Sequence, residues 1–205
     1  IDVVPVSMAI ERSIGRVPIN HLGDKWLPTT FWASSSMPLF YRVLKRILDL
    51  VVAIALLALT LPLLVLALLM TKITSKGPVF YLQQRVGLKG VPFRIVKIRT
   101  MRPDAEAGGA QWATKDDQRI TAVGRMLRAT RIDELPQLWN VFRGDMSLVG
   151  PRPERPEFVE QLEKEIPYYR ARFSVRPGIT GWAQVQHRYA NSVEDSKTKL
   201  ESDLY

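Results

Sequence analysis

The sequence has no cysteine among its 205 residues. This absence excludes disulfide bridges, thiol nucleophiles and sites that bind zinc or iron through thiolates. Histidine is almost absent too, because only His21 and His187 occur and they are far apart in the chain. A histidine-rich metal cluster and a serine–histidine–acid triad are therefore not expected. Transfer or hydrolytic chemistry in this chain has to rely on carboxylates.

Acidic residues are the minority charge: 20 Asp and Glu stand against 29 Lys and Arg, which leaves a net charge of +9. Apolar residues make up 46% of the chain and charged residues 24%, a composition typical of one folded domain with a core. Between Lys76 and Arg152, fourteen basic residues face seven acidic ones. This excess favours an anionic partner, such as a phosphate, a nucleic acid or an anionic lipid surface, and does not choose among them.

The longest apolar run extends from Leu50 to Met70 and contains no charge, no glycine and one polar side chain, Thr60. As a continuous helix it would be about 31 Å long at ~1.5 Å per residue, close to the thickness of the hydrocarbon layer. Pro62 lies in the middle of the run, where it removes a backbone donor and predicts a kink. Thr60 is placed to satisfy the carbonyl that Pro62 frees.

Basic residues flank this run on both sides: Arg42, Lys45 and Arg46 before it, and Lys72, Lys76, Arg85 and Lys89 after it. Because basic residues favour the cytoplasmic side, both ends are expected on one face of the membrane. The sequence thus favours a re-entrant helix that breaks at Pro62. An ordinary kinked span is the alternative.

Two strands and a tight connection are predicted after the run, over 79–86, 87–90 and 91–99. Because side chains alternate along a strand, Lys97 and Arg99 are expected on one face of the second strand. Two neighbouring cations there suit a diphosphate, and two solvated surface charges are the alternative.

Two helices are predicted next. The first runs to Thr130, with Asp116 and Asp117 at its N-terminus, and the second follows from Ile132 to a stop at Gly144. Five apolar residues recur at helical spacing in the second: Ile132, Leu135, Leu138, Trp139 and Phe142. Three polar residues fall on the polar face opposite this apolar stripe: Asp133, Gln137 and Asn140.

Asp133 and Glu134 form an acidic pair at the start of this second helix, close to Arg128 and Arg131. The positive end of the helix and the arginines are expected to keep both carboxylates ionised, as a nucleophile or a metal ligand requires. Capping of the helix by Asp133 is the structural alternative. A rigid turn follows at 150–153, where Pro151 and Pro153 fix the backbone on both sides of Arg152.

Several segments together resemble the bacterial sugar transferases, the monotopic phosphoglycosyl transferases that act on polyprenyl phosphate. The segments are GPVF at 77–80, QRVG at 84–87, KIRTM at 97–101, DELPQ at 133–137, GDMS at 144–147, GPRP at 150–153 and RPGITG at 176–181. The resemblance covers residues 40–205 and includes the kinked apolar run. It implies an α/β (α+β) fold with a re-entrant membrane helix, a small β-hairpin and several helices at the membrane interface.

The resemblance also implies a division of the chain. Residues 1–40 would be a linker or remnant of an upstream region, 41–75 the re-entrant membrane helix, and 76–205 the catalytic domain. The chain is expected to be a truncated large-form member, located at the bacterial inner membrane with its catalytic domain in the cytoplasm.

The activity implied is transfer of sugar-1-phosphate from a UDP-sugar to undecaprenyl phosphate, which releases UMP and starts a membrane glycan such as O-antigen, capsule or exopolysaccharide. Asp133 would attack the β-phosphate to form a covalent phosphosugar enzyme, and Glu134 would hold Mg²⁺. Candidate phosphate or uridine contacts are Lys97, Arg99, Arg128, Pro151, Arg152, Pro153 and Arg176. Membrane phospholipids are expected partners, nucleic acid is not, and a homodimer stays open.

Two other functions remain as alternatives. A membrane-anchored basic module could bind anionic lipid or nucleic acid without catalysis, although the basic residues are dispersed for that role. A phosphohydrolase would share the acidic pair and need no polyprenyl acceptor. The sugar itself cannot be assigned, because hexose discrimination depends on a few pocket contacts.

Overall fold

The computed structural model describes residues 13–19, 38–105, 109, 117–187 and 192–205. Its helices are Leu39–Thr74 (α3), Ala122–Thr130 (α4), Gln137–Arg143 (α5), Pro156–Glu165 (α6), Trp182–Gln186 (α7) and Val193–Asp203 (α8), and its strands are Phe80–Val86 (β1), Pro92–Ile98 (β2), Ser147–Val149 (β3) and Gly178–Thr180 (β4). Short 3₁₀ turns lie at Leu88–Gly90 (η3), Ile132–Glu134 (η4) and Tyr169–Ser174 (η5). This mixed helix and sheet architecture confirms the predicted class.

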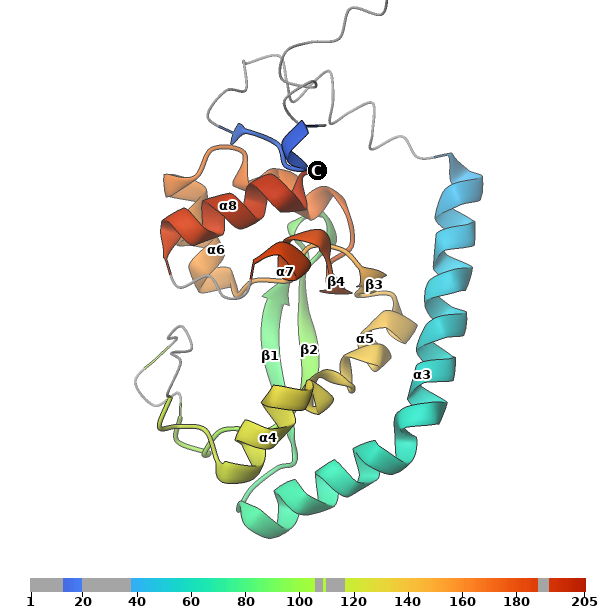
Figure 1. The fold of residues 1–205 in the computed structure, drawn as a ribbon, viewed down its shortest axis with the longest axis vertical. Helices are drawn as coiled ribbons and strands as arrows, with labels where there is room; N and C mark the ends of the chain where they lie inside the picture. Colours follow the sequence, from blue (N-terminus) through green and yellow to red (C-terminus); the bar gives the residue numbers. More distant parts are fainter. Residues whose placement is uncertain (1–12, 20–37, 106–108, 110–116, 188–191) are drawn as a thin grey trace, which may run out of the picture.

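α3 is a 36-residue helix that contains the whole apolar run and Pro62. It is the one helix in the described part of the chain that is long and apolar enough to cross a membrane, and its most apolar window is only 17% buried. Figure 1 shows that α3 bends, so that its two arms run in different directions along the outside of the remaining structure. The predicted kink is thus present in an exposed apolar helix.

Thr60 does not satisfy the carbonyl that Pro62 frees, which belongs to Ala58, four residues before the proline. Its hydroxyl donates instead to the carbonyl of Leu56, at 2.7 Å. The expectation for Thr60 was therefore wrong, because a helical threonine reaches the carbonyl four residues before itself and not four before the proline. Such a bond adds to the tendency of a helix to bend.

The predicted hairpin is confirmed. β1 and β2 pair antiparallel from Phe80 with Ile98 to Val86 with Pro92, and η3 forms the connection. Figure 1 shows this hairpin running through the middle of the molecule, with α4 and α5 near one end and α6, α7 and α8 near the other. The hairpin therefore connects the part of the protein that holds α4 and α5 to the C-terminal helices (Figure 1).

α4 begins later than the sequence predicts, at Ala122. Thr121 caps it, because the Thr121 hydroxyl accepts a hydrogen bond from the Gly124 amide at 2.9 Å. Asp117 instead forms an ion pair of 2.6 Å with Arg119, and Asp116 lies outside the described residues. The predicted acidic N-terminus is thus wrong for Asp117, since Thr121 lies directly before the first helical residue and threonine is also a favoured cap.

α5 stops at Gly144 as predicted, but it begins at Gln137 and not at Ile132, and its polar face is buried. Gln137 is 1% exposed and Asn140 0%, whereas Trp139 is 50% exposed and stacks on Phe142 with a centroid distance of 5.4 Å. Asn140 is buried because its side chain serves as a partner for the edge of β2: Oδ1 accepts from the Val96 amide at 3.0 Å, and Nδ2 donates to the Arg94 carbonyl at 2.7 Å. Helical spacing defined the two faces without showing which one is covered.

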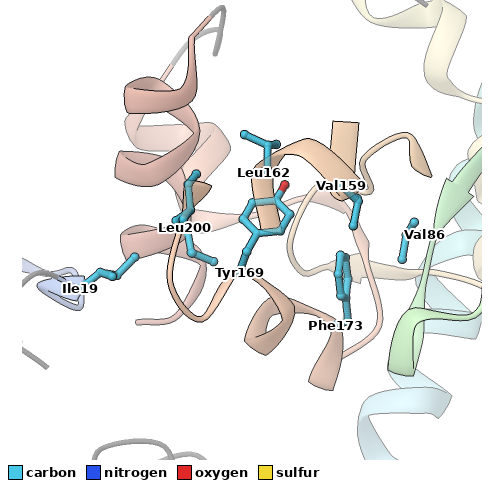
Figure 2. Packing of buried hydrophobic residues seen from close by; sticks show 8 residues of the cluster. Ile19, Val86, Val159, Leu162, Tyr169, Phe173 and Leu200 are labelled. Carbon is cyan, nitrogen blue, oxygen red and sulfur yellow. The ribbon is translucent and has the colours of Figure 1, made fainter. Parts of the chain in front are cut away.

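Apolar packing forms two regions. Beside α3, the buried residues are Ala53, Leu64, Ala67, Ile95, Ile98, Leu127, Leu138, Val141 and Met146, in two clusters that share Leu57 and Leu135 at their edges. The second region joins α6, η5 and α8 to the end of β1, and Figure 2 shows Tyr169 and Phe173 at its centre. Buried residues from both arms of α3 therefore contact the same folded part.

Part of the segment predicted as a linker also packs on this second region. Val17 is fully buried and its amide donates to the Glu201 carbonyl of α8 at 2.8 Å, and Ile19 belongs to the core in Figure 2. Residues 13–19 thus contribute to the core of the C-terminal helices. The boundaries at residues 40 and 75 stay predictions.

Candidate active site

Asp133 and Glu134 lie in η4, the short turn between α4 and α5. Arg131 ends α4 in the left-handed conformation, with φ of 60°, and so turns the chain sharply into η4. Both carboxylates are buried, with exposures of 6% for Asp133 and 9% for Glu134. The sequence placed the pair in the first turn of a helix from Ile132, whereas the structure places it in a separate 3₁₀ turn before α5, with both side chains buried.

Glu134 is surrounded by cations from three separate elements. Its two oxygens accept hydrogen bonds from Arg152 at 2.7 and 3.3 Å, Lys97 Nζ lies 3.4 Å away, and Arg131 Nη1 lies 3.6 Å away. Burial by itself raises the pKa of this carboxyl, but Lys97 and Arg152 together outweigh it and hold the pKa well below its usual range. Glu134 is therefore ionised and fully engaged.

Lys97 is the member of this group whose charge is easiest to remove. Burial and, to a smaller extent, the charge of Arg152 lower the pKa of Lys97 while Glu134 partly opposes them, and the net pKa is about 8. The Lys97 side chain is 16% exposed and projects from β2 toward Glu134, a contact that the sequence did not predict. Its ammonium group therefore titrates close to physiological pH.

Asp133 differs from its neighbour. Burial, followed by the charge of Glu134, raises its pKa, and the opposing effects of Lys97 and Arg128 are smaller. Its Oδ1 atom is buried and has no hydrogen-bond partner among the described residues. The expectation that the helix end and arginines dominate this carboxyl was thus wrong, because desolvation is stronger at this depth. A buried carboxylate oxygen without a partner is costly and indicates a position kept for a ligand or a reaction.

Arg152 is oriented by a backbone turn whose carbonyls are all occupied. From residue 151 to 154, the four carbonyls accept hydrogen bonds from Gly178 N at 2.9 Å, Arg172 Nη2 at 2.9 Å, Arg85 Nη1 at 3.1 Å and Val86 N at 2.9 Å. Pro151 and Pro153 fix φ and have no amide hydrogen to pair. The turn is therefore held from several sides, and the guanidinium leaves it in a defined direction.

The remaining predicted cations are dispersed. Arg99 lies at the C-terminal end of α3, where Nη2 donates to the Ser75 carbonyl at 2.9 Å, so it does not project together with Lys97 toward Glu134. Arg176 donates to the Gly144 carbonyl at 3.1 Å, at the end of α5 away from the acidic pair. Arg128 donates to the Thr100 hydroxyl at 2.8 Å and contributes charge at Asp133. The structure thus brings together Asp133, Glu134, Lys97 and Arg152, with Arg128 and Arg131 beside them.

Two groups of residues near the site were not found by sequence reasoning. Arg85 and Arg172 hold the Arg152 turn, and a cluster of Lys45, Asp49 and Ser147 ties α3 to β3. Asp49 had a signal that was not used: it is an acid directly before the apolar run, where a charge is expensive unless it is paired. Arg172 had no local signal.

A buried carboxylate with a free oxygen, next to a cluster of oriented cations, is suited to phosphoryl transfer. Positioned cations neutralise a diphosphate, and a carboxylate can attack phosphorus. The same geometry does not need a histidine or a thiol, in agreement with the composition.

Comparisons with known proteins identify relatives of the same kind. A UDP-N-acetylgalactosamine-undecaprenyl-phosphate N-acetylgalactosaminephosphotransferase of Aeromonas hydrophila is 45% identical over 206 residues, which cover 100% of this chain and 47% of that protein. UDP-glucose:undecaprenyl-phosphate glucose-1-phosphate transferases of Caulobacter vibrioides and Escherichia coli are 52% and 41% identical, over 78% and 80% of this chain and 61% and 36% of their own lengths. The chain thus spans less than two thirds of each of these relatives.

The family described as bacterial sugar transferase matches residues 40–205, the part of the chain that holds the apolar helix, the hairpin, the acidic pair and the Arg152 turn. This match covers most of the chain, and the relatives named above are themselves sugar transferases that act on undecaprenyl phosphate. The chain belongs to the bacterial sugar transferase family.

Proposed function

We propose that this protein transfers sugar-1-phosphate from a UDP-sugar to undecaprenyl phosphate through a covalent intermediate on Asp133. The observation that carries the proposal is the contrast within the acidic pair. Glu134 is saturated by Arg152 and Lys97, whereas Asp133 beside it keeps a buried oxygen without a partner among the described residues. The names of the relatives supply the substrate classes.

In the first step, a carboxylate oxygen of Asp133 attacks the β-phosphorus of the UDP-sugar. A bond forms between this oxygen and phosphorus, the bond from phosphorus to the bridging oxygen breaks, and UMP leaves with that oxygen. In the second step, a phosphate oxygen of undecaprenyl phosphate attacks the same phosphorus and releases the Asp133 carboxylate. Lys97 and Arg152 stabilise charge on the phosphates in both steps.

Magnesium fits this site only in part. Within the described ranges, no cluster of three or more His, Cys, Asp or Glu side chains has the arrangement of a metal site. Both oxygens of Glu134 accept hydrogen bonds from Arg152, so Glu134 is not free to hold Mg²⁺ in this arrangement. A divalent ion would be held by Asp133 together with phosphate oxygens of the substrate, as Mg²⁺ commonly is, and would supply charge neutralisation. Glu134 instead orients the cations.

The re-entrant topology is part of the proposal and is supported by contacts of both arms of α3. In the first arm, Lys45 and Arg46 bind Ser147 and the carbonyl of Val141, and Ala53 packs in the core beside α5. In the second arm, Leu64 and Ala67 pack with Ile98 and Leu127. A segment with both arms on one folded domain enters and leaves a membrane by the same face. Because basic flanks are favoured on the cytoplasmic side, these contacts support a catalytic domain that faces the cytoplasm at the inner membrane.

The exposed stack of Trp139 and Phe142 supports the same orientation. It lies on α5, the helix that Figure 1 shows beside α3, and amphipathic aromatic side chains favour the membrane interface. Arg143, on the same helix, has a side chain that is 58% exposed and suits contact with anionic phospholipid headgroups.

The activity is tested by incubating the chain in lipid nanodiscs with a panel of UDP-sugars and Mg²⁺, first without and then with undecaprenyl phosphate. The proposal expects, for the correct sugar, at most one UMP per protein without acceptor and multiple turnovers with it. Continuous release of sugar phosphate without acceptor would indicate the phosphohydrolase. Absence of UMP with every sugar, together with salt-sensitive binding to anionic vesicles, would indicate the non-catalytic module. The panel includes N-acetylgalactosamine and glucose donors, because the relatives differ in their sugar.

The topology is tested with single cysteines, which the cysteine-free sequence makes simple. Cysteines at Arg42 and Lys76 lie just outside the two ends of the apolar part of α3. In oriented inner-membrane vesicles, a membrane-impermeant thiol reagent is expected to label both from the same side. Labelling from opposite sides would exclude re-entry without affecting the assignment of the reaction.

A further inference from the structure

The C-terminal helix α8 reaches the arginine turn through one buried ion pair. We infer that Arg172 and Asp203 are positioning residues for Arg152: the pair fixes the backbone of the turn and so the direction of the Arg152 guanidinium toward Glu134. This inference rests on the proposed function, because it assigns these two residues a part in the rate of that reaction. Neither belongs to the acidic pair or to the cations that contact it.

The contacts of Arg172 form a continuous path from α8 to the acidic pair. Arg172 Nη2 donates to Asp203 Oδ2 at 2.8 Å and to the Arg152 carbonyl at 2.9 Å. The side chain of Arg152 then donates to both oxygens of Glu134. One nitrogen atom of Arg172 thus joins the C-terminal helix directly to the residue that orients the site.

The second half of the guanidinium is held as well. Arg172 Nη1 donates to the Tyr169 hydroxyl, and Arg172 Cζ lies 5.0 Å from the centroid of the Tyr169 ring. Figure 2 shows Tyr169 in the middle of the apolar cluster, next to Leu162 and Leu200. The orientation of Arg172 is therefore set by Tyr169 in the core and by Asp203, independently of its contact with the turn.

The environment explains why the carboxylate of Asp203 is needed. The side chains of Arg172 and Asp203 are only 8% and 3% exposed. A buried guanidinium that loses its counter-charge is strongly destabilised and moves toward another anion or toward water. Any such movement releases the carbonyl of Arg152 itself, while the carbonyls of the neighbouring residues keep their partners, so the turn is loosened at the residue that carries the guanidinium.

The chain provides a matched control for this ion pair. Arg170, two residues before Arg172 in the chain, forms a similar ion pair, with 2.8 Å between its Nε and Glu163 Oε1. Unlike Arg172, Arg170 has a side chain that is 82% exposed. This surface pair joins α6 to η5 and lies outside the path that leads to Arg152. Removing its acid therefore tests an ion pair of the same type, without the proposed connection.

The experiment compares Asp203→Asn with Glu163→Gln in the full chain in nanodiscs, with UMP release followed in a single turnover. We expect Asp203→Asn to lower the rate at saturating UDP-sugar by about 10- to 100-fold while KM changes by less than about threefold, because misorientation acts mainly in the transition state. Glu163→Gln is expected to keep the rate of the unmodified chain. Equal rates for the two variants would overturn the inference.

A double-mutant cycle separates positioning from general damage. If Asp203 acts through Arg152, then Asp203→Asn has little further effect in a chain that already carries Arg152→Ala, because the group that it positions is gone. A loss of the same factor in both backgrounds would show a merely structural role and overturn the inference. Enzyme in excess over substrate keeps the slow background measurable.

Tyr169→Phe is the second variant in case Asp203→Asn does not fold. It keeps the ring in the core and removes only the hydroxyl that accepts from Arg172. We expect a smaller loss of rate, about three- to tenfold, and the same non-additivity with Arg152→Ala. An unchanged rate in this variant would overturn the inference. If the unmodified chain releases no UMP with any donor, the proposed function fails instead, and the two failures are thus distinct.

Discussion

Asp49 and Asp133 are both buried carboxylates, and their surroundings are opposite. Asp49, on the first arm of α3, is 4% exposed and accepts hydrogen bonds from Lys45 at 2.5 Å, the Ser147 hydroxyl at 2.8 Å and the Leu148 amide at 3.3 Å. Asp133 is 6% exposed and keeps one oxygen without a partner among the described residues. The first is satisfied within the fold and the second is not.

Under the proposed function, this difference separates a structural carboxylate, Asp49, from a reacting one, Asp133. A satisfied buried acid lowers the free energy of the folded state and holds two elements together, here α3 and β3. An unsatisfied buried acid raises that free energy, and folded proteins tolerate it where a reaction needs it. Substitution should therefore have opposite effects on stability and activity at the two positions.

The largest effect is expected for Asp133→Asn. Formation of the covalent intermediate should fall by at least about a thousandfold, because the nucleophile is lost. Stability should be unchanged or higher at pH 7: the raised pKa of Asp133 means that its ionised form carries a cost in the folded state at any pH above that pKa, and asparagine removes this cost. Single-turnover UMP release and the thermal midpoint of the chain in nanodiscs measure the two effects. A clear loss of stability together with normal UMP release would reverse the comparison.

Glu134→Gln should lower both activity and stability, since Glu134 is satisfied by ion pairs, as Asp49 is, and also lies in the candidate active site, as Asp133 does. Activity should fall by about 10- to 100-fold as Lys97 and Arg152 lose their common anion, and unfolding should become easier by about 1–3 kcal/mol. The pKa of Glu134 is depressed, so its contribution to stability is present above its ordinary pKa and is lost as the pH falls below it. The thermal midpoint of the variant should therefore depend less on pH in acid than that of the unmodified chain. If the thermal midpoint of the variant depends on acidic pH as strongly as that of the unmodified chain, the ion pairs of Glu134 do not stabilise the fold.

The pH dependence of the rate sharpens the role of Lys97. Its pKa of about 8 predicts that the rate of UMP release falls above pH 8, because the Lys97 ammonium group loses its proton and with it the positive charge that attracts phosphate. Stability should change in the opposite direction: the folded state loses this proton at lower pH than the unfolded state does, so stability rises from about pH 8 toward the ordinary lysine pKa. Lys97→Arg should move the decline in rate to higher pH. If the rate of Lys97→Arg still declines near pH 8, the decline is caused by the titration of another group.

Asp49→Asn should have the smallest effect on chemistry and a clear effect on stability. The ion pair with Lys45 is lost while one acceptor oxygen remains, and Lys45 is half-exposed, so we expect a loss of about 1–2 kcal/mol and a two- to fivefold lower rate. Asp104→Asn, at an exposed position, is the control and should change neither quantity. A loss of activity as large as that of Asp133→Asn would show that Asp49 takes part in the reaction.

Much of the site was predictable from the sequence because its signals are local. The DELPQ segment, the proline-flanked Arg152 and the strand that carries Lys97 each have a spacing or composition that the structure retains. Arg99 was grouped with them by its alternation with Lys97 along the strand, and Arg176 by its place in the RPGITG segment. Neither argument shows which partner a side chain finds, and these two side chains donate to carbonyls at the ends of α3 and α5.

The sequence by itself determined the family, the apolar helix with its proline, the hairpin and the position of the acidic pair, because each depends on residues that are near neighbours in the chain. Only the tertiary structure decided which face of α5 is buried, which cations reach Glu134, and that Asp203 lies at the other end of a path to Arg152. The physical reason is that a polar group can be buried only where a partner from another element satisfies it. Asn140 is buried because β2 supplies such partners, whereas Asp133 is buried with one oxygen that no described residue satisfies, and the proposed function rests on this exception.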